Sequence, residues 1–295
     1  MTSDFLRSLM GRKPALPAEV EEARAELTRL AREQPVLAEL AGQLGDFLPA
    51  LYSEPIRAIA PALTTEKAAE KLSTGVPLLR SEPLEIDWPA LKRRLRDMVA
   101  ALAQRRADAA PALVRAINSA EFDVVALTSA ILAGQPQVVH ERAEALGLDV
   151  PMTASVLSLA LFPIFGAIRT DLEPLLSAGT WKEGYCPVCG SFPMLGEFRG
   201  LEQIRYLRCG LCAAEWQFPR LRCPCCGNRD HRQLGYLHVA GEENKCRAAT
   251  CEECRQYVKM ISTLMPLPPL KLLVTDVATV HLDLLAADNG FSSPM

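Results

Sequence analysis

The sequence predicts a multi-domain α+β protein, in which an all-helical N-terminal domain precedes two small metal-binding β modules and a C-terminal helix. Three observations lead to this fold class. Apolar residues recur at helical spacing through the first part of the chain. All ten cysteines are confined to residues 186–254. A length of 295 residues favours about two domains with room for a sizeable core.

Residues 1–180 are expected to form the helical domain. Its apolar stripes include Val20, Ala23, Leu27 and Leu30, then Leu37, Leu40, Leu44 and Leu48, and then Leu91, Leu95, Met98, Val99 and Leu102. Asp87 is an expected N-cap, because Pro89 fits the first turn of the helix that follows. Stripes of this kind are typical of core packing, and we assign them no chemistry.

The compartment is predicted from the amino terminus and from the cysteines. The first residues lack the continuous apolar stretch of an export signal, which indicates a cytoplasmic protein. The longest apolar run, residues 154–168, contains Pro163 and is shorter than the roughly 20 residues needed to cross a bilayer, so we expect a buried helix and no stable membrane insertion. In a reducing compartment we expect the cysteines not to form disulfides.

Eight cysteines form four Cys-x-x-Cys pairs. In chain order these are Cys186 with Cys189, Cys209 with Cys212, Cys223 with Cys226, and Cys251 with Cys254. The short turn inside such a pair directs both sulfurs toward one metal ion, and a second pair completes a tetrahedron. Four pairs therefore predict two sites of four thiolates each. Tetrahedral thiolate sites accept both zinc and iron, so the spacing does not identify the metal.

The order of the pairs predicts how they combine. The first and third pairs have the form Cys-Pro-x-Cys-Gly, which makes residues 181–219 and 220–262 two copies of one unit. Gly190 and Gly227 fit a turn that needs positive φ. The stretches 203–207 and 233–239 are suited to hairpins between the pairs. A cross-braced arrangement, which would join the first pair to the third, also gives two sites and remains open.

The remaining cysteines and the histidines receive simpler interpretations. Cys225 and Cys246 are expected to be free thiols, although Cys225 could be activated by the neighbouring ligands. His231 and His238 lie in the second unit, where four thiolates already complete the site. The helical patterns around His140 and His281 contain no partner cluster, so both are interpreted as packed or surface residues.

Residues 263–295 form the C-terminal segment. The Pro-rich linker 266–269 is followed by a predicted strand, 270–274, and by a predicted helix from about Asp276 to Ala287 that ends near Gly290. Because its apolar residues are spaced three and four apart, this helix is expected to pack back on the core.

The cysteine motifs resemble those of FdhE, the formate dehydrogenase accessory protein family. The similar stretches read CPVCGSFPM, YLRCGLCAAEWQ, RCPCCGN and CEECRQYVK, and DVATVHLDLLAADNGF resembles the family's C-terminal helix. The resemblance implies two rubredoxin-like modules, each with one metal ion, iron first and zinc second. It assigns the ligand roles to the eight paired cysteines and treats Cys225 as a departure from the family pattern.

The same resemblance implies a function. Family members are cytoplasmic proteins needed for active formate dehydrogenase and are not known as catalysts. The implied partner is the catalytic subunit of a respiratory, molybdenum-type formate dehydrogenase, before its export.

Two other functions compete with this one. A nucleic-acid-binding zinc ribbon is the commonest generic interpretation of paired cysteines. However, the net charge of the whole chain is -3, and two tetrathiolate centres would add negative charge to the modules, so little attraction to phosphate is expected. A thiol oxidoreductase would place a single Cys-x-x-Cys at a helix start in a βαβ context, which four such pairs do not match.

Overall fold

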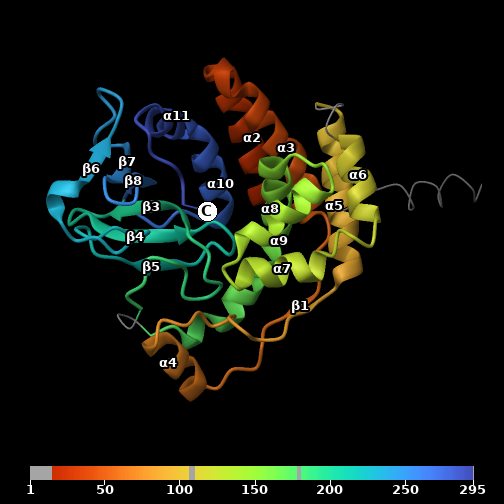
Figure 1. The fold of residues 1–295 in the computed structure, drawn as a ribbon. Coiled ribbons are helices and arrows are strands. Elements are labelled where there is room, and N and C mark those ends of the chain that lie inside the picture. Colours follow the sequence, from red (N-terminus) through yellow and green to blue (C-terminus); the bar gives the residue numbers. More distant parts are fainter. Residues whose placement is uncertain (1–14, 106–109, 178–180, 295) are drawn as a thin grey trace, which may run out of the picture.

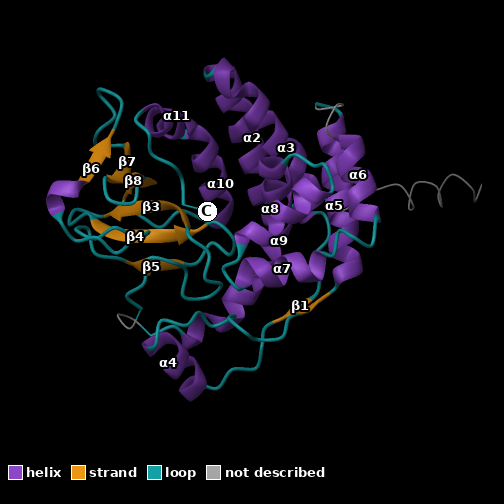
Figure 2. Cartoon of the chain, in the orientation of Figure 1, coloured by secondary structure: helices purple, strands orange, loops and turns teal. Residues whose placement is uncertain are grey.

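The computed structural model describes residues 15–105, 110–177 and 181–294, in which a helical half lies beside a half built on one β-sheet (Figures 1 and 2). The helices of the first half are α2 (Ala18–Glu33), α3 (Ala38–Tyr52), α4 (Thr65–Ser73), α5 (Trp88–Ala103), α6 (Ala110–Asn118), α7 (Val124–Leu132), α8 (Pro136–Ala145) and α9 (Val150–Leu172). Two 3-10 turns, η1 (Pro35–Leu37) and η2 (Glu173–Leu175), and the paired short strands β1 (Ala58–Ile59) and β2 (Glu85–Ile86) complete it. This arrangement confirms the predicted helical N-terminal region.

Helix α5 begins where its sequence signal predicts. The carboxylate of Asp87 accepts a hydrogen bond of 2.9 Å from the backbone N–H of Ala90, which is the expected N-cap of α5. Asp123 and Asp149 cap α7 and α9 in the same way. The apolar stripes of α2 and α5 are buried as predicted. Both helices pack against α3, and burial of such apolar faces is the usual main source of helix stability.

Helix α9 is the central helix of this half. By length and composition alone, the segment Val150–Leu175 could cross a membrane, and half of its apolar window is buried inside the protein. Ten residues of α9, from Thr153 to Leu172, are buried, and the helix packs against α5 and α8 (Figure 1). The predicted buried helix is therefore present as a core element.

The second half contains a six-stranded sheet. Its strands are β3 (Pro193–Arg199), β4 (Ile204–Cys209), β5 (Glu215–Gln217), β6 (Leu234–Leu237), β7 (Cys246–Cys251) and β8 (Gln256–Thr263), and a 3-10 turn, η3 (His231–Gln233), precedes β6. The strand order is β5-β4-β3-β8-β7-β6. Both predicted hairpin regions contribute strands, β4 and β6.

The sheet order shows how the two cysteine units join. Each unit is an antiparallel meander of three strands, so its first and third strands run in the same direction. β3, the first strand of the first unit, pairs in parallel with β8, the third strand of the second unit. The two copies therefore follow one another head to tail in a single continuous sheet.

A buried cluster of charges stabilises the first unit. Glu197 on β3 is fully buried and forms ion pairs with Arg199 and Arg208, and Arg199 also binds Glu215 through two hydrogen bonds of 2.9 and 2.7 Å. Arg208 donates a 2.9 Å hydrogen bond to the carbonyl of Leu267, which ties the linker after β8 to this cluster. The buried carboxylate is thus neutralised by two guanidinium groups.

The predicted strand at 270–274 is wrong, because this segment forms α10 (Pro269–Ala278), which α11 (Val280–Asp288) follows. A short apolar run does not by itself distinguish a strand from a buried helix. Pro269 at the first helical position is a helix-start signal, and it favours a helix over a strand for this segment. The predicted helix from Asp276 is present in two parts, since α10 ends at Ala278 and α11 extends to Asp288.

Candidate metal centres

The first four-cysteine group is fully enclosed. The thiols of Cys186, Cys189, Cys209 and Cys212 all lie within 4.8 Å of one another, and each residue is 0% exposed. The Sγ atoms of Cys186 and Cys212 are 3.5 Å apart, and those of Cys189 and Cys209 are 3.3 Å apart. A tetrahedron with metal–sulfur bonds of about 2.3 Å has sulfur–sulfur edges of about 3.8 Å. Both distances lie within about 0.5 Å of that edge.

The second group is open on one side. Cys223 and Cys251 are buried, Cys254 is half-buried and Cys226 is exposed. The Sγ–Sγ distances are 3.7 Å for Cys223 with Cys254 and 3.7 Å for Cys226 with Cys251, close to the edge of that tetrahedron. Each group combines consecutive pairs, so the cross-braced alternative is wrong.

All four pairs share one backbone geometry. Gly190 and Gly227 follow the second cysteine of their pairs with φ of 83° and 80°, as predicted. Ala213 and Arg255 occupy the same position in the other pairs, with φ of 57° and 55°. A residue with a Cβ is disfavoured there by roughly 1–2 kcal/mol. The sequence signal was therefore incomplete, because two pairs form the same turn without glycine.

This turn also presents N–H groups to sulfur. The backbone N–H of Val188 points at the Sγ of Cys186 at 3.4 Å, that of Leu211 at the Sγ of Cys209 at 3.3 Å, and that of Cys225 at the Sγ of Cys223 at 3.4 Å. Such contacts stabilise thiolates and orient them toward a metal. The donor set and its surroundings thus fit a tetrahedral ion at both centres.

The first centre lies at the boundary between the two halves of the molecule. The loop after α4 runs beside the Cys186–Cys189 turn, where the N–H groups of Leu78 and Leu79 donate hydrogen bonds of 2.8 and 2.9 Å to the carbonyls of Pro187 and Val188. The hydroxyl of Tyr185 donates a 2.7 Å hydrogen bond to the carbonyl of Gly75. The metal-binding turn is therefore also the docking surface for the helical half.

Arginine side chains compensate charge beside the second centre. Arg205, Arg220 and Arg222 line a small cavity of about 50 Å³ together with Cys223 and Cys225. Burial lowers the pKa of Arg205 to about 10, against the opposing effect of nearby acidic groups that include Cys223, so its guanidinium remains charged at neutral pH. Four thiolates around a divalent ion carry a charge of about -2, which these cations offset.

Cys225 contacts one of the proposed ligands, since its backbone N–H lies 3.4 Å from the Sγ of Cys223. A hydrogen bond with Cys225 lowers the pKa of Cys223 to about 4, which favours a thiolate at that ligand position. The same hydrogen bond, together with burial, raises the pKa of Cys225 far above its usual range. The free thiol at Cys225 stays a prediction.

The histidines divide into two groups. His231 and His238 are exposed and belong to none of the metal-ligand groups found among the described residues, and His140 lines a cavity. The expectation that His281 has no partner cluster is wrong, because its Nε2 atom lies 3.2 Å from Glu242 Oε2 and 3.8 Å from Cys246 Sγ. These three residues lie on α11, on the β6–β7 loop and at the start of β7, so no local spacing could have revealed the cluster.

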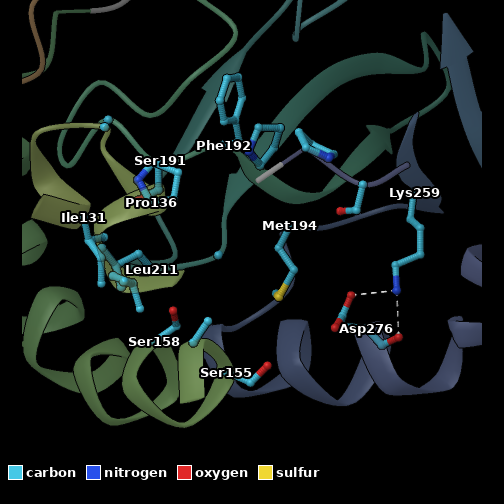
Figure 3. Close-up of a pocket in the computed structure, with 18 of the residues that line it drawn as sticks. Ile131, Pro136, Ser155, Ser158, Ser191, Phe192, Met194, Leu211, Lys259 and Asp276 are labelled. Carbon is cyan, nitrogen blue, oxygen red and sulfur yellow. Dashed lines mark hydrogen bonds and ion pairs between the residues drawn. The ribbon is translucent and has the colours of Figure 1, made fainter. Parts of the chain in front are cut away.

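A cavity of about 590 Å³ lies between the helical half and the sheet (Figure 3). Ser155 and Ser158 of α9 line one side, and Ser191 and Leu211, from the turns of the first centre, line another. On the side formed by the sheet and the C-terminal helices, Lys259 points toward Asp276 (Figure 3). The distance from Lys259 Nζ to Asp276 Oδ1 is 2.7 Å. The cavity therefore borders both the first centre and the C-terminal helices.

The charged group in this cavity was not predicted. Lys259 also pairs with Asp283 at 2.7 Å, and the hydroxyl of Tyr257 donates a 2.7 Å hydrogen bond to the other oxygen of Asp283. Burial raises the pKa of Asp276, while Lys259 opposes the shift. The four residues come from β8, α10 and α11, and the wrong strand assignment of 270–274 concealed their proximity.

The fold and both centres define a helical domain joined to a tandem of four-cysteine, zinc-ribbon-like modules. Family models match the modules in succession. The model described as FdhE, central domain, matches residues 185–220, and the model described as FdhE, C-terminal domain, matches residues 221–294.

Individual relatives agree with these matches. The chain is 37% identical over 146 residues to a protein named "Protein FdhE homolog" from Stutzerimonas stutzeri, an alignment that covers 45% of this chain and 46% of the relative. The homologue of the same name from Enterobacter sp. is 26% identical over 99% of this chain and 90% of its own length. The matched part thus spans about half of the first relative and most of the second.

A solved structure resembles the whole fold. The crystal structure of the FdhE protein from Pseudomonas aeruginosa superposes with a TM-score of 0.61 at 26% identity, covering 95% of each chain. Together with the family models and the curated relatives, this structural match supports an FdhE family protein.

Proposed function

We propose that this chain is a cytoplasmic accessory protein, rather than a catalyst, that is required for active respiratory formate dehydrogenase and binds its catalytic subunit. Membership of the FdhE family supports the proposal. The observation that favours a binding role is the asymmetry between the centres. One is enclosed at the contact between the two halves, and the other has an exposed cysteine at the surface.

The eight paired cysteines are the proposed ligands of two mononuclear metal ions. The proposed modules are residues 181–219 and 220–262, between a helical domain at 1–180 and the C-terminal segment 263–295. Iron is favoured and zinc is the alternative, because a tetrathiolate set suits both. In either case the ions hold the short meanders in shape, since a module of this size has a small core of its own.

The metal is tested by purifying the full chain without oxygen and measuring its elements and its visible spectrum. We expect two irons per chain at the four-cysteine centres, with red ferric-thiolate absorption after mild oxidation. Two zincs and a colourless protein would make both centres structural. A well-folded preparation that has met no chelator and contains no metal would contradict the ligand assignment.

The second centre is the proposed contact for the client. Leu221 is 67% exposed next to its arginines, and Tyr236 is 41% exposed on β6. Exposed apolar side chains beside a rigid metal-binding turn are suited to recognising another protein. The first centre is unsuited to this role because its four thiols are covered.

Function is tested in cells that lack this chain. We expect formate dehydrogenase polypeptide to persist while its activity is lost, because an accessory protein acts after synthesis of its client. Wild-type chain should restore activity, and Leu221→Asp should restore much less, because the charge would lie in the proposed contact. Leu201→Asp is the matched control, since Leu201 is 98% exposed on the β3–β4 turn of the first module.

Normal activity in the deletion cells, with no redundant factor present, would contradict the accessory function. Equal restoration by the two aspartate variants would contradict the proposed contact surface alone.

A further inference from the structure

A third group of metal-type donors lies apart from the two four-cysteine sets. The donor atoms are Oε2 of Glu242, Sγ of Cys246 and Nε2 of His281. Their mutual distances are 3.7 Å for oxygen to sulfur, 3.8 Å for sulfur to nitrogen and 3.2 Å for nitrogen to oxygen. We propose that these three residues form a third metal site, which binds a divalent ion of the zinc type.

The triangle has the dimensions of one face of a zinc tetrahedron. Bonds of about 2.3 Å to sulfur and about 2.0–2.1 Å to nitrogen and oxygen place the donors roughly 3.3–3.6 Å apart in tetrahedral geometry. The observed edges lie within a few tenths of an ångström of these values. A mixed sulfur, nitrogen and oxygen set favours zinc over calcium or magnesium, which prefer oxygen alone.

Separate elements position the donors. The carbonyl of Glu242 accepts hydrogen bonds from the N–H groups of Lys245 and Cys246 at 2.8 and 3.0 Å, so the β6–β7 turn holds the first two donors side by side. Cys246 begins β7, where it pairs with Ile261 of the neighbouring strand. His281 lies in the first turn of α11, which packs against β7. Two donors are therefore held by a strand and a helix, and the third by a hydrogen-bonded turn.

A nucleophilic triad does not explain the same residues. In such a triad the imidazole uses one ring nitrogen for the nucleophile and the other for the carboxylate. Here the Nε2 atom of His281 faces both the Cys246 thiol and the Glu242 carboxylate. A single cation between the three atoms satisfies all of them at once.

The site would have an open coordination position. Three protein donors leave the fourth corner of the tetrahedron for water or an external ligand, as in zinc sites that exchange ligands. The side chains of Glu242 and His281 are 41% and 33% exposed, so that corner is accessible from solvent. A bound ion would also fasten α11 to the second module.

The test is the number of zinc ions per full-length chain. Protein loaded with zinc, then freed of loosely bound ions by gel filtration, should contain three per chain, or one zinc beside two irons if the four-cysteine centres retain iron. Cys246→Ser and His281→Gln should each lose one ion and keep the other two. Loss of a direct ligand should weaken binding by more than the roughly 10- to 100-fold that outer-shell partners contribute.

His231→Gln is the matched control, because His231 is an exposed histidine of the same module outside the donor group, and it should keep the third ion. Glu242→Gln, in an exposed turn, provides a third ligand variant if Cys246→Ser folds poorly, and far-ultraviolet circular dichroism establishes folding for each. A wild-type chain with only two ions, or ligand variants that keep all three, would overturn the proposal. Neither outcome bears on the accessory function, which does not depend on this site.

Discussion

Cells that make the Cys186→Ser/Cys189→Ser variant should contain little folded protein, and any recovered chain should lack one of its two tetrathiolate-bound ions. Apparent binding energies for structural zinc reach about 10–16 kcal/mol at neutral pH. This is as large as the total stability of most domains, about 5–15 kcal/mol. The loss is amplified here because the same turn accepts the hydrogen bonds of Leu78 and Leu79 from the helical half. Four buried thiol or hydroxyl groups would also be left without a cation.

The Cys223→Ser/Cys226→Ser variant is the matched comparison. It removes the equivalent pair of the second unit, where Cys226 is exposed and where the described structure shows no hydrogen bond from the α4–β2 loop. We expect it to lose one ion but to retain the folded helical half. Soluble yield, metal content and thermal unfolding distinguish the two. Equal losses of stability would show that the first centre has no special role in joining the halves.

The second large effect is expected for Glu197→Gln. Glu197 is fully buried and neutralises Arg208, whose side chain is only 4% exposed. Removing one partner of a buried ion pair leaves an uncompensated charge and typically costs about 3–5 kcal/mol. The glutamine keeps nearly the same shape, so the loss arises from charge and hydrogen bonding rather than from packing. This loss of stability is measured as the change in the free energy of unfolding in urea, with metal present throughout.

Glu215→Gln is the control for this prediction. Glu215 binds Arg199 in the same cluster, but its side chain is 38% exposed. Ion pairs near the surface contribute about 0–1 kcal/mol, so the control should change stability little. If the two variants were equally stable, the cluster would not depend on its buried carboxylate.

The parts of the fold that could be predicted depend on local sequence signals. Asp87 caps α5 because its carboxylate needs only the N–H three residues later. The cysteine pairs meet because each pair is a turn of fixed geometry and each unit is one short meander. Spacing along the chain was sufficient for both.

Contacts between segments that are distant in the chain could not be predicted from the sequence. His281 meets Cys246 only because α11 packs on β7, and Lys259 meets Asp276 only because residues 270–274 are helical. The contact of Leu78 with the Cys186–Cys189 turn joins positions more than a hundred residues apart through backbone atoms, which leave no side-chain pattern in a sequence.

The place of β8 in the sheet affects how the chain can mature on the ribosome. β8 is the last strand to be synthesised, yet it lies in the middle, between β3 and β7. Until residues 256–263 have left the exit tunnel, β3 has an open hydrogen-bonding edge that can pair with another chain. The two units therefore become one sheet only when β8 inserts between β3 and β7, so closing of the sheet waits for the last strand of the second unit.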